Sequence, residues 1–580
     1  MKYQNIYQLF RDQTAKYRGE NIFYARENDS WKAQTWNDFE RQAHDFACAL
    51  LAKNLTKGAS VAILAGNVPE WTIVDVAAIA AGGVGVGIYP TSSPEQCEYI
   101  INHSDAEFIF VDTKAQLEKI LGIFEKIKRV KHIICLEEDS ETSIEYPESL
   151  TNKVEFRENE PPLFITRKKV ILSLKDFLDF GNYCRPKFLK TVEEIGFNAK
   201  SKNTAIMVYT SGTTGQPKGA MLSHQYVLNS VESLKNSVPI FHEDVSFSYL
   251  PGCHVAERIS GIYNRLYNGT AAYFVDDLSK LYAYMLEIQP TVFASLPRFF
   301  EKIYAKVVSE FGADASEQNL KDAFGGNVRL LTSGGAPLPN EIAQFFATRN
   351  LPILQAYGLT ENICVAFNTP QNLKFGTVGK AMPMCEIKIA ADGEILIKSS
   401  MMFSGYYKDA AKTAEMFDEN GWLKTGDLGE LDREGFLCIT GRKKEIIVLS
   451  SGKNVAPALV ENLVKENHLV SQCFLSGDGK SYCVALITLN QAEAEALARA
   501  NEIEFSNFVD LIQNERIYHS ISETVAKVNS KVSSNEQIKK FLILDRDFSL
   551  ENDEITPTMK LKRNVVSEKF KDVLEALYKI

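Results

Sequence analysis

The sequence YTSGTTGQPKG, residues 209–219, follows the apolar run TAIMV, and it alternates hydroxyl side chains with glycines before it reaches Lys218. Glycine lets a ligand approach the backbone closely, hydroxyls and free N–H groups donate hydrogen bonds, and the lysine adds positive charge. Such a loop suits phosphate oxygens, although a Gly/Ser/Thr loop taken alone is also typical of a flexible hairpin tip. The chain has no GxxxxGK[ST], GxGxxG or GxSxG, so a Walker A loop, a Rossmann dinucleotide site and a hydrolase elbow are not indicated.

The composition is that of a folded chain with several cored units. The 580 residues are 45% hydrophobic and 24% charged, which excludes collagen-like and wholly disordered proteins. At roughly 100 to 200 residues per domain, at least two domains are expected. The 74 acidic and 64 basic side chains give a net charge of −10, so no nucleic-acid partner is expected.

The cysteines and the apolar runs favour a cytoplasmic protein. Ten Cys are scattered without a CxxC pair, which argues against a zinc module and against a secreted disulfide framework. The first residues lack the apolar core of a signal peptide, and the most apolar run, residues 76–89, is shorter than the roughly 18 residues that span a bilayer. We expect at most peripheral contact with a membrane, and the oligomeric state stays open.

Helical stretches alternate with short β-branched runs through most of the first 350 residues. Examples are SVAILAGN, GVGVGIYP, AEFIFVD and VKHIICL, followed later by TAIMVYT, AAYFVDD, TVFASLP and VRLLTSG. The alternation predicts an α/β fold of doubly wound, mostly parallel sheets. Residues 378–448 predict a small β-rich subdomain, and the rest predicts a small, mobile α+β C-terminal domain. The charged, Pro-containing residues 137–202 are expected to form a surface insertion with little chemistry.

The full string at residues 209–219 resembles the signature of the adenylate-forming superfamily, which includes acyl-CoA synthetases, luciferases and peptide-synthetase adenylation domains. The resemblance implies that the loop surrounds the phosphates of ATP, that Thr213 and Lys218 act in catalysis and that Thr210 also lies near Mg²⁺. The other loop residues implied to bind the nucleotide are Ser211, Gly212, Thr214 and Gly215.

Two further segments, SGGAP at 333–337 and QAYGLTE at 355–361, resemble the family's adenine and α-phosphate region. The resemblance implies that the Tyr357 ring packs on the base, that Thr360 touches the α-phosphate and that Glu361 holds Mg²⁺ and acts in catalysis. The other residues implied to line the nucleotide site are Gly334, Gly335, Ala336, Gln355 and Gly358. Asn362 stands where the family usually has Ser or Thr.

TGDLG at 425–429 and GRKKE at 441–445 resemble the ribose-binding acid and the domain junction of the family. Asp427 can accept hydrogen bonds from both ribose hydroxyls, and Arg442 can reinforce the same nucleotide. By the same resemblance Lys444 is the hinge, which gives an N-terminal domain of residues 1–443 and a C-terminal domain of residues 444–580.

TPTMKLKR at 556–563 resembles the mobile C-terminal loop, with Lys560 as the catalytic lysine. A cation there would offset the repulsion between a carboxylate and the α-phosphate as they react. Met559 replaces the Gly that is common in the superfamily, a departure that resembles the long-chain branch.

LPGCHVAER at 250–258 resembles the same long-chain branch and implies that His254 lies beside the acyl site. Glu257 and Arg258 are expected to form a local ion pair. A lone His near an apolar run is equally typical of a structural histidine.

The resemblance therefore implies that the chain activates a long-chain fatty acid with ATP and Mg²⁺ through acyl-AMP and then transfers the acyl group to CoA. Two alternatives stay open: a fatty acyl-AMP ligase that delivers the acyl group to a carrier protein, and a non-catalytic nucleotide- or acyl-binding relative. A lack of CoA-dependent product would favour the first, and binding without pyrophosphate release would favour the second.

Overall fold

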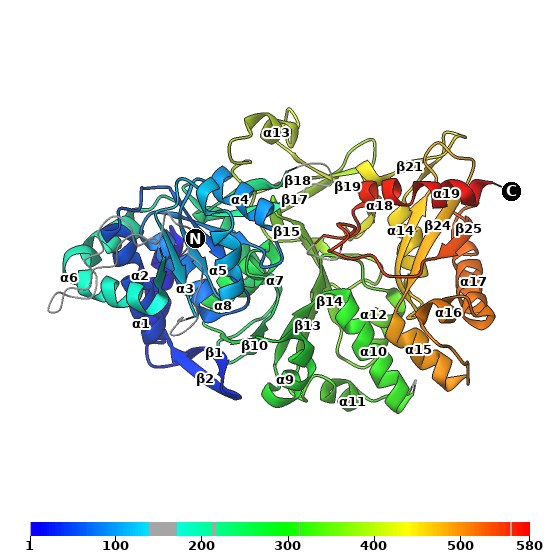
Figure 1. The fold of residues 1–580 in the computed structure, drawn as a ribbon, viewed down its shortest axis with the longest axis horizontal. Coiled ribbons are helices and arrows are strands. Elements are labelled where there is room, and N and C mark those ends of the chain that lie inside the picture. The colour runs from blue at the N-terminus through cyan, green and yellow to red at the C-terminus, as the bar shows by residue number, and fades with distance from the viewer. Residues whose placement is uncertain (1, 138–170, 211–215, 313, 557–559, 580) are drawn as a thin grey trace.

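The computed structural model describes residues 2–137, 171–210, 216–312, 314–556 and 560–579 (Figure 1). A seven-stranded sheet dominates the first part of the chain. Its neighbouring strands are parallel except for the last two, which are antiparallel. In spatial order the strands are β7 (Ile171–Ser173), β6 (His132–Cys135), β5 (Ala106–Val111), β3 (Ser60–Leu64), β4 (Val84–Ile88), β8 (Thr204–Thr210) and β9 (Lys218–Ser223).

Helices cover both faces of this sheet, which explains why its central strands are continuous apolar runs. On one face α3 (Pro69–Ala80) lies between the sheet and α2 (Trp36–Ala52), so almost all of its residues are buried. On the other face α4 (Pro94–His103) and α5 (Lys114–Leu121) share a core with the sheet. The remaining helices of this part are α1 (Ile6–Lys16), α6 (Leu174–Asn198), α7 (His224–Ser237), α8 (Asn264–Asn268) and the short η1 (Phe124–Lys126).

Two further sheets complete the α/β part. A four-stranded sheet pairs, in order, β10 (Val245–Ser248), β11 (Ala271–Phe274), β1 (Asn21–Glu27) and β2 (Ser30–Thr35). A five-stranded sheet pairs β12 (Val292–Ser295), β13 (Leu330–Gly334), β14 (Ile353–Leu359), β15 (Asn362–Phe367) and β16 (Lys380–Ala381). The helices between these strands are the π-helix η2 (Ala256–Tyr263), η3 (Leu278–Lys280), α9 (Leu281–Ile288), α10 (Pro297–Phe311), α11 (Glu317–Asp322) and α12 (Asn340–Ala347).

The expected β-rich region is an antiparallel sheet of four strands. These are β17 (Cys385–Ile389), β18 (Glu394–Ser399), β19 (Leu423–Leu431) and β20 (Leu437–Arg442), with α13 (Ala410–Glu415) inserted before β19. The short helix η4 (Lys443–Glu445) then leads to the C-terminal part.

The C-terminal part is a three-stranded sheet of β23 (Val470–Ser476), β24 (Cys483–Leu489) and β25 (Ile538–Ile543) with helices packed against it. Its other elements are β21 (Ile447–Val448), β22 (Asn454–Val455), α14 (Pro457–Val464), α15 (Gln491–Ala500), α16 (Phe508–Ile512), α17 (Glu515–Asn529), α18 (Arg563–Lys569) and α19 (Lys571–Tyr578). Among the residues placed by the structure, no cluster of buried apolar side chains joins residues before 444 to residues after it. Figure 1 shows this part, coloured yellow to red, beside the rest of the molecule.

The expectation of a surface insertion at residues 137–202 is wrong for residues 171–198. β7 extends the seven-stranded sheet, and α6 packs along α2 with Phe177 buried against Phe46 at a ring-centroid distance of 4.7 Å. Gly181 permits this close approach, because a Cβ atom there would lie 1.8 Å from the carbonyl oxygen of Asp45. Residues 138–170 lie outside the described part of the chain.

Candidate active site

The phosphate-loop candidate joins β8 to β9. Strand β8 ends at Thr210, which is paired with Lys218 at the start of β9, while Ser211, Gly212, Thr213, Thr214 and Gly215 lie outside the described residues. The Lys218 ammonium lies 5.1 Å from the centre of the Tyr406 ring, a cation–π contact. Tyr406 is brought there by backbone hydrogen bonds that tie residues 404–407 to β9, among them the 2.9 Å bond from the Met221 N–H to the Gly405 carbonyl.

Glu361 lies in the turn between β14 and β15, and only 8% of it is exposed. The Tyr406 hydroxyl donates a hydrogen bond to its carboxylate, so Lys218, Tyr406 and Glu361 form a connected group. Burial, followed by the negative charge of Glu361, raises the pKa of Tyr406 far above its ordinary value, so this hydroxyl stays a donor. The neighbouring Thr360 is fixed through its carbonyl, which accepts a 2.9 Å hydrogen bond from the Tyr226 hydroxyl.

The Glu361 carboxylate suits Mg²⁺. Within the described ranges, no group of three or more His, Cys, Asp or Glu side chains converges on a metal site. Mg²⁺ in nucleotide-dependent enzymes is commonly held by one or two carboxylates together with phosphates and water, so a single oriented glutamate fits that pattern. Thr210, the last residue of β8, is the cross-strand partner of Lys218, and its hydroxyl would add a further oxygen.

Asp427 is buried, and both of its carboxylate oxygens have protein partners. The Tyr357 hydroxyl donates to one oxygen at 2.5 Å, and the Arg442 Nε atom lies 2.9 Å from the other. Arg442 faces Asp427 across the β19–β20 pair, so strand register alone places them together. The three residues therefore form one polar cluster built from β14, β19 and β20.

The glycine-rich turn after β13 forms an exposed rim beside this cluster. Gly335 has a φ of +80°, a backbone conformation that glycine adopts without strain, and Gly335 and Ala336 are exposed. Gln355 is buried and accepts a 3.2 Å hydrogen bond from the Leu338 N–H, so it holds the turn in place. Gly334 pairs with Ala356 between β13 and β14. Gly358 lets β14 lie close to β15, because a Cβ atom there would lie 1.9 Å from the carbonyl oxygen of Ile363.

His254 begins the turn that leads into η2, and its Nδ1 atom accepts a 3.2 Å hydrogen bond from the Ala256 N–H. Burial, with a smaller contribution from the positive charge of Lys560, lowers the pKa of His254 to about 4. The imidazole is therefore neutral at physiological pH.

The expected Glu257–Arg258 ion pair is wrong. Arg258 and Asp75, both fully buried, pair with each other, and Tyr263 donates a 2.7 Å hydrogen bond to the same carboxylate. Glu257 instead lies 2.7 Å from Arg265. Adjacent residues of a helix point in different directions, so two neighbouring charges find partners on other elements.

Lys560 is the predicted catalytic residue that lies in the C-terminal part. Although its side chain is exposed, the surrounding protein lowers the pKa of Lys560, and the Arg442 guanidinium lowers it further, against the opposing effect of Asp427. The charges of Arg442 and Asp427 act on Lys560, and the charge of Lys560 acts on His254, so Lys560 lies within electrostatic range of these side chains. Direct contacts join Asp427, Arg442 and Tyr357, and Lys560 lies within electrostatic range of the first two, while Lys444 lies on η4 between the two parts.

The chain is similar to known protein families and to named relatives. Residues 10–407 match the AMP-binding enzyme family, and residues 444–580 match the AMP-binding enzyme C-terminal domain. The chain belongs to the AMP-binding enzyme family. Two similar relatives are the long-chain-fatty-acid–CoA ligase FadD15 of Mycobacterium bovis and the long-chain-fatty-acid–CoA ligase ACSBG2 of Xenopus laevis. Each is 31% identical to the chain; the alignments cover 96% and 99% of the chain and 94% and 83% of the relatives.

Solved structures of other enzymes share the fold of this AMP-binding enzyme. The anthranilate CoA ligase AuaEII in complex with anthranoyl-AMP has a TM-score of 0.76 at 18% identity and covers 99% of the chain and 98% of its own length. ATP-bound MatB from Rhodopseudomonas palustris has a TM-score of 0.73 at 19% identity, with 98% and 100% covered. With relatives named as ligases along nearly its whole length, the protein is a ligase. In the described part of this AMP-binding enzyme, every helix is too short or too polar to cross a membrane.

Sequence reasoning missed Tyr406 as a site residue of this AMP-binding enzyme. It lies in GYYKD, residues 405–409, but nothing in its local pattern indicates contact with Glu361. The contact depends on the pairing of residues 404–407 with β9, which is a long-range feature.

Proposed function

We propose that the protein activates a long-chain fatty acid with ATP to form acyl-AMP and pyrophosphate, and that it then transfers the acyl group to CoA. The observation that carries this proposal is the polar cluster of Asp427, Tyr357 and Arg442, with Lys560 within electrostatic range of the Asp427–Arg442 pair. The names of the similar ligases support the choice of a long-chain acid and CoA.

The chemistry requires positive charge because a carboxylate and a triphosphate repel each other. One fatty carboxylate oxygen attacks the α-phosphorus, and the bond from that phosphorus to the pyrophosphate oxygen breaks. Lys560 would stabilise the charge that develops on the reacting oxygens, and Lys218 that on the leaving pyrophosphate. Mg²⁺, held by Glu361 and the phosphates, would neutralise further phosphate charge.

The nucleotide would be oriented by the polar cluster of β14, β19 and β20. Each Asp427 oxygen has a second lone pair beyond its bonds to Tyr357 and Arg442, so it can accept a ribose hydroxyl. The exposed turn at Gly335 and Ala336 would receive the adenine. His254, neutral and partly buried, adds no charge that would bind the fatty carboxylate too tightly before it reacts.

Transfer to CoA requires a different surface at the same site. We place the hinge for this change at Lys444, because the parts on its two sides have separate apolar cores. Rotation there would withdraw Lys560 and open access for the thiol, whose sulfur attacks the acyl carbon and expels AMP.

Pyrophosphate release tests the proposal directly. The purified protein is incubated with ATP, Mg²⁺ and each of a series of saturated fatty acids of increasing chain length, with and without CoA. We expect release that depends on a long acid and is stimulated by CoA, with acyl-CoA as product. Release of about one equivalent that CoA does not affect would favour the carrier-protein alternative, and nucleotide binding without release would favour a non-catalytic relative.

A further inference from the structure

Between β25 and α18, residues 554–556 pair with residues 560–562. We call this paired segment the neck, and Lys560 lies on its returning side. The Thr556 N–H donates to the Lys560 carbonyl at 2.8 Å, Ile555 pairs with Leu561, and the Lys562 N–H donates to the Glu554 carbonyl at 2.8 Å. The position of Lys560 is thus fixed by the residues at the base of this neck.

Glu554 stands at that base, and its side chain is fully buried. Its two carboxylate oxygens each accept a 2.7 Å hydrogen bond from Arg546, which makes a bidentate pair. One oxygen also accepts a 3.2 Å bond from the Ser549 N–H, and the Lys569 ammonium lies 3.6 Å from the other. Arg546 holds the pKa of Glu554 below its ordinary value, so the carboxylate stays charged.

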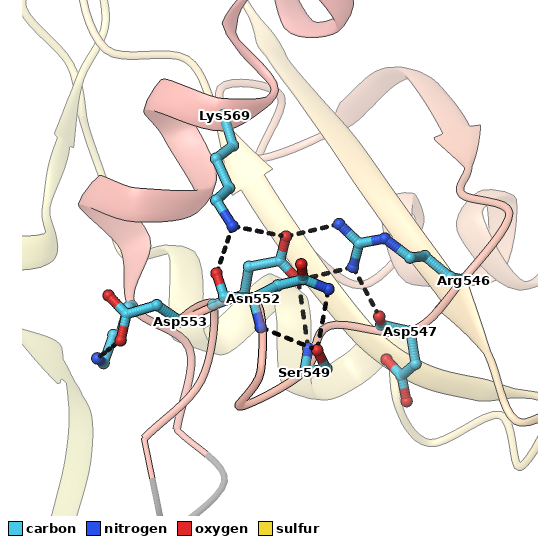
Figure 2. Close-up of polar contacts among 8 residues, drawn as sticks. Arg546, Asp547, Ser549, Asn552, Asp553 and Lys569 are labelled. Carbon is cyan, nitrogen blue, oxygen red and sulfur yellow. Dashed lines mark hydrogen bonds and ion pairs between the residues drawn. The ribbon is translucent and has the colours of Figure 1, made fainter. Parts of the chain in front are cut away.

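Figure 2 shows how this group connects separate segments. Arg546 follows β25, Ser549 and Asn552 lie on the intervening turn, and Lys569 on α18 reaches back to the Asn552 carbonyl. Glu554 therefore ties the strand end, the turn and the helix together through its side chain, and the returning strand of the neck through its backbone.

Anchoring of the neck alone does not account for the buried Glu554 carboxylate and its partners. The apolar side of the neck is already anchored, because Ile555 packs in a core with Phe548 and Val566. The far end is anchored too, since Arg563 lies 2.6 Å from Glu461 on α14. Apolar residues of similar size often stabilise a fold as well as a buried ion pair does, so a gain in stability alone does not explain why a charge is buried here.

We propose that Glu554 is a positioning residue, which together with Arg546 and Lys569 sets the place of Lys560 during formation of acyl-AMP. The inference rests on the proposed function of Lys560. It predicts that loss of the Glu554 charge affects the step that uses Lys560 and leaves the CoA step largely intact.

The test compares the two half-reactions in the full-length protein. Glu554→Gln keeps the shape of the side chain and removes its charge. We expect the rate of pyrophosphate release to fall roughly 10- to 100-fold, because small displacements of a reacting group have effects of this size. The KM for ATP and the formation of acyl-CoA from supplied acyl-AMP should stay close to the wild-type values.

Two variants serve as controls. Glu575→Gln also removes a carboxylate paired with a lysine of the C-terminal part, Lys480 at 2.7 Å, but lies on α19 away from the neck, so both half-reactions should be unchanged. Arg546→Lys keeps a cation and replaces the bidentate pair by a single contact, so it should show an intermediate loss confined to pyrophosphate release, even if Glu554→Gln does not fold.

The outcomes separate this inference from the proposed function. If Lys560→Ala loses pyrophosphate release selectively while Glu554→Gln and Arg546→Lys behave like wild type, the positioning role is overturned and the function stands. Equal loss of both half-reactions in Arg546→Lys, with a lower melting temperature, would show a purely structural role and also overturn it. If the wild-type protein releases no pyrophosphate with any acid, both proposals are overturned.

Discussion

Tyr406 is the residue through which the phosphate loop and the proposed Mg²⁺ ligand are connected. Its ring contacts Lys218 and its hydroxyl holds the carboxylate of Glu361. The hydroxyl orients the Glu361 carboxylate and would therefore affect Mg²⁺ binding. The ring would affect the position of Lys218. Substitution by phenylalanine separates the two contributions, since only the hydroxyl is removed.

We expect Tyr406→Phe to lower pyrophosphate release about tenfold and to raise the Mg²⁺ concentration needed for half-maximal rate, because hydrogen bonds to charged groups contribute roughly 1.5–3 kcal/mol. A Mg²⁺ titration of the rate measures both effects. Tyr407→Phe is the matched control, since its hydroxyl bonds Asp105 at 2.8 Å instead. An equal change in both variants would contradict the assignment.

His224 provides a second prediction at this scale, on stability. Burial lowers its pKa from the ordinary 6.5 to about 4, and its Nδ1 atom accepts a hydrogen bond from the Ile6 N–H at 3.3 Å. Between these pKa values the unfolded chain binds the proton and the folded one does not, so stability is lost as the pH falls from 6.5 towards 4. The loss is about 1.4 kcal/mol for each pH unit.

The measurement is urea unfolding at several pH values within that range. His224→Asn keeps an acceptor for the Ile6 N–H and cannot be protonated, so the unfolding free energy should depend less on pH than in the wild type. His519→Asn, which removes an exposed imidazole in place of a buried one, is the matched control. No difference between His224→Asn and the wild type would mean that other groups cause the acid sensitivity.

At the scale of elements, the contact between α2 and α6 depends on the absence of a side chain at Gly181. In an ordinary helix interior Gly→Ala stabilises by roughly 1 kcal/mol. Here the added Cβ atom would meet the Asp45 backbone at 1.8 Å, so Gly181→Ala should destabilise the protein by roughly 1–3 kcal/mol. Thermal unfolding of the variant measures the effect.

The control for this change is Gly122→Ala at the end of α5. Its backbone is already helical, and an added Cβ atom would lie at least 3.5 Å from its neighbours. This variant should be as stable as the wild type or slightly more so. A Gly181→Ala protein with an unchanged melting temperature would show that the two helices separate without cost.

The elements also show how much of the fold could be predicted from the sequence. Five strands of the seven-stranded sheet, β3, β4, β5, β6 and β8, could be predicted, because buried parallel strands are unbroken apolar runs and each run is local. The antiparallel β17–β20 sheet could be predicted only as a β-rich region. The role of residues 171–198 could not, since α6 is half-polar and its partner α2 lies more than a hundred residues earlier. For the same reason the partner of Arg258 is Asp75, 183 residues away, and not its neighbour.

The candidate site divides in the same way. The Asp427–Arg442 pair agrees with the predicted proximity because both residues lie in one hairpin. The Tyr406–Glu361 contact requires three segments to meet, and no local pattern carries that information. The roles assigned to Thr213 and its loop neighbours remain predictions, as those residues lie outside the described chain.

At the scale of the whole molecule, the proposed alternation between two half-reactions is a movement about Lys444. Proline restricts φ and the preceding residue, so Lys444→Pro should fix one arrangement. Since Lys560 lies within electrostatic range of the Asp427–Arg442 pair in this arrangement, we expect acyl-AMP formation to persist and acyl-CoA formation to fall sharply. Rapid-quench measurement of each half-reaction tests this.

Lys444→Ala keeps the torsional freedom of the backbone and serves as the matched variant, with both half-reactions expected near the wild-type rate. A proline variant that makes acyl-CoA at the normal rate would exclude this residue as the pivot.

The separate cores on the two sides of residue 444 have a consequence for how the polypeptide can be divided. Neither half contributes apolar side chains to the other's interior in the described chain, so neither needs a covalent connection in order to fold. Two polypeptides cut at the junction should each be soluble, and mixing them should restore the step that uses Lys560 only at high concentration. The peptide bond at the junction would then serve chiefly to keep the lysine at a high effective concentration over the nucleotide.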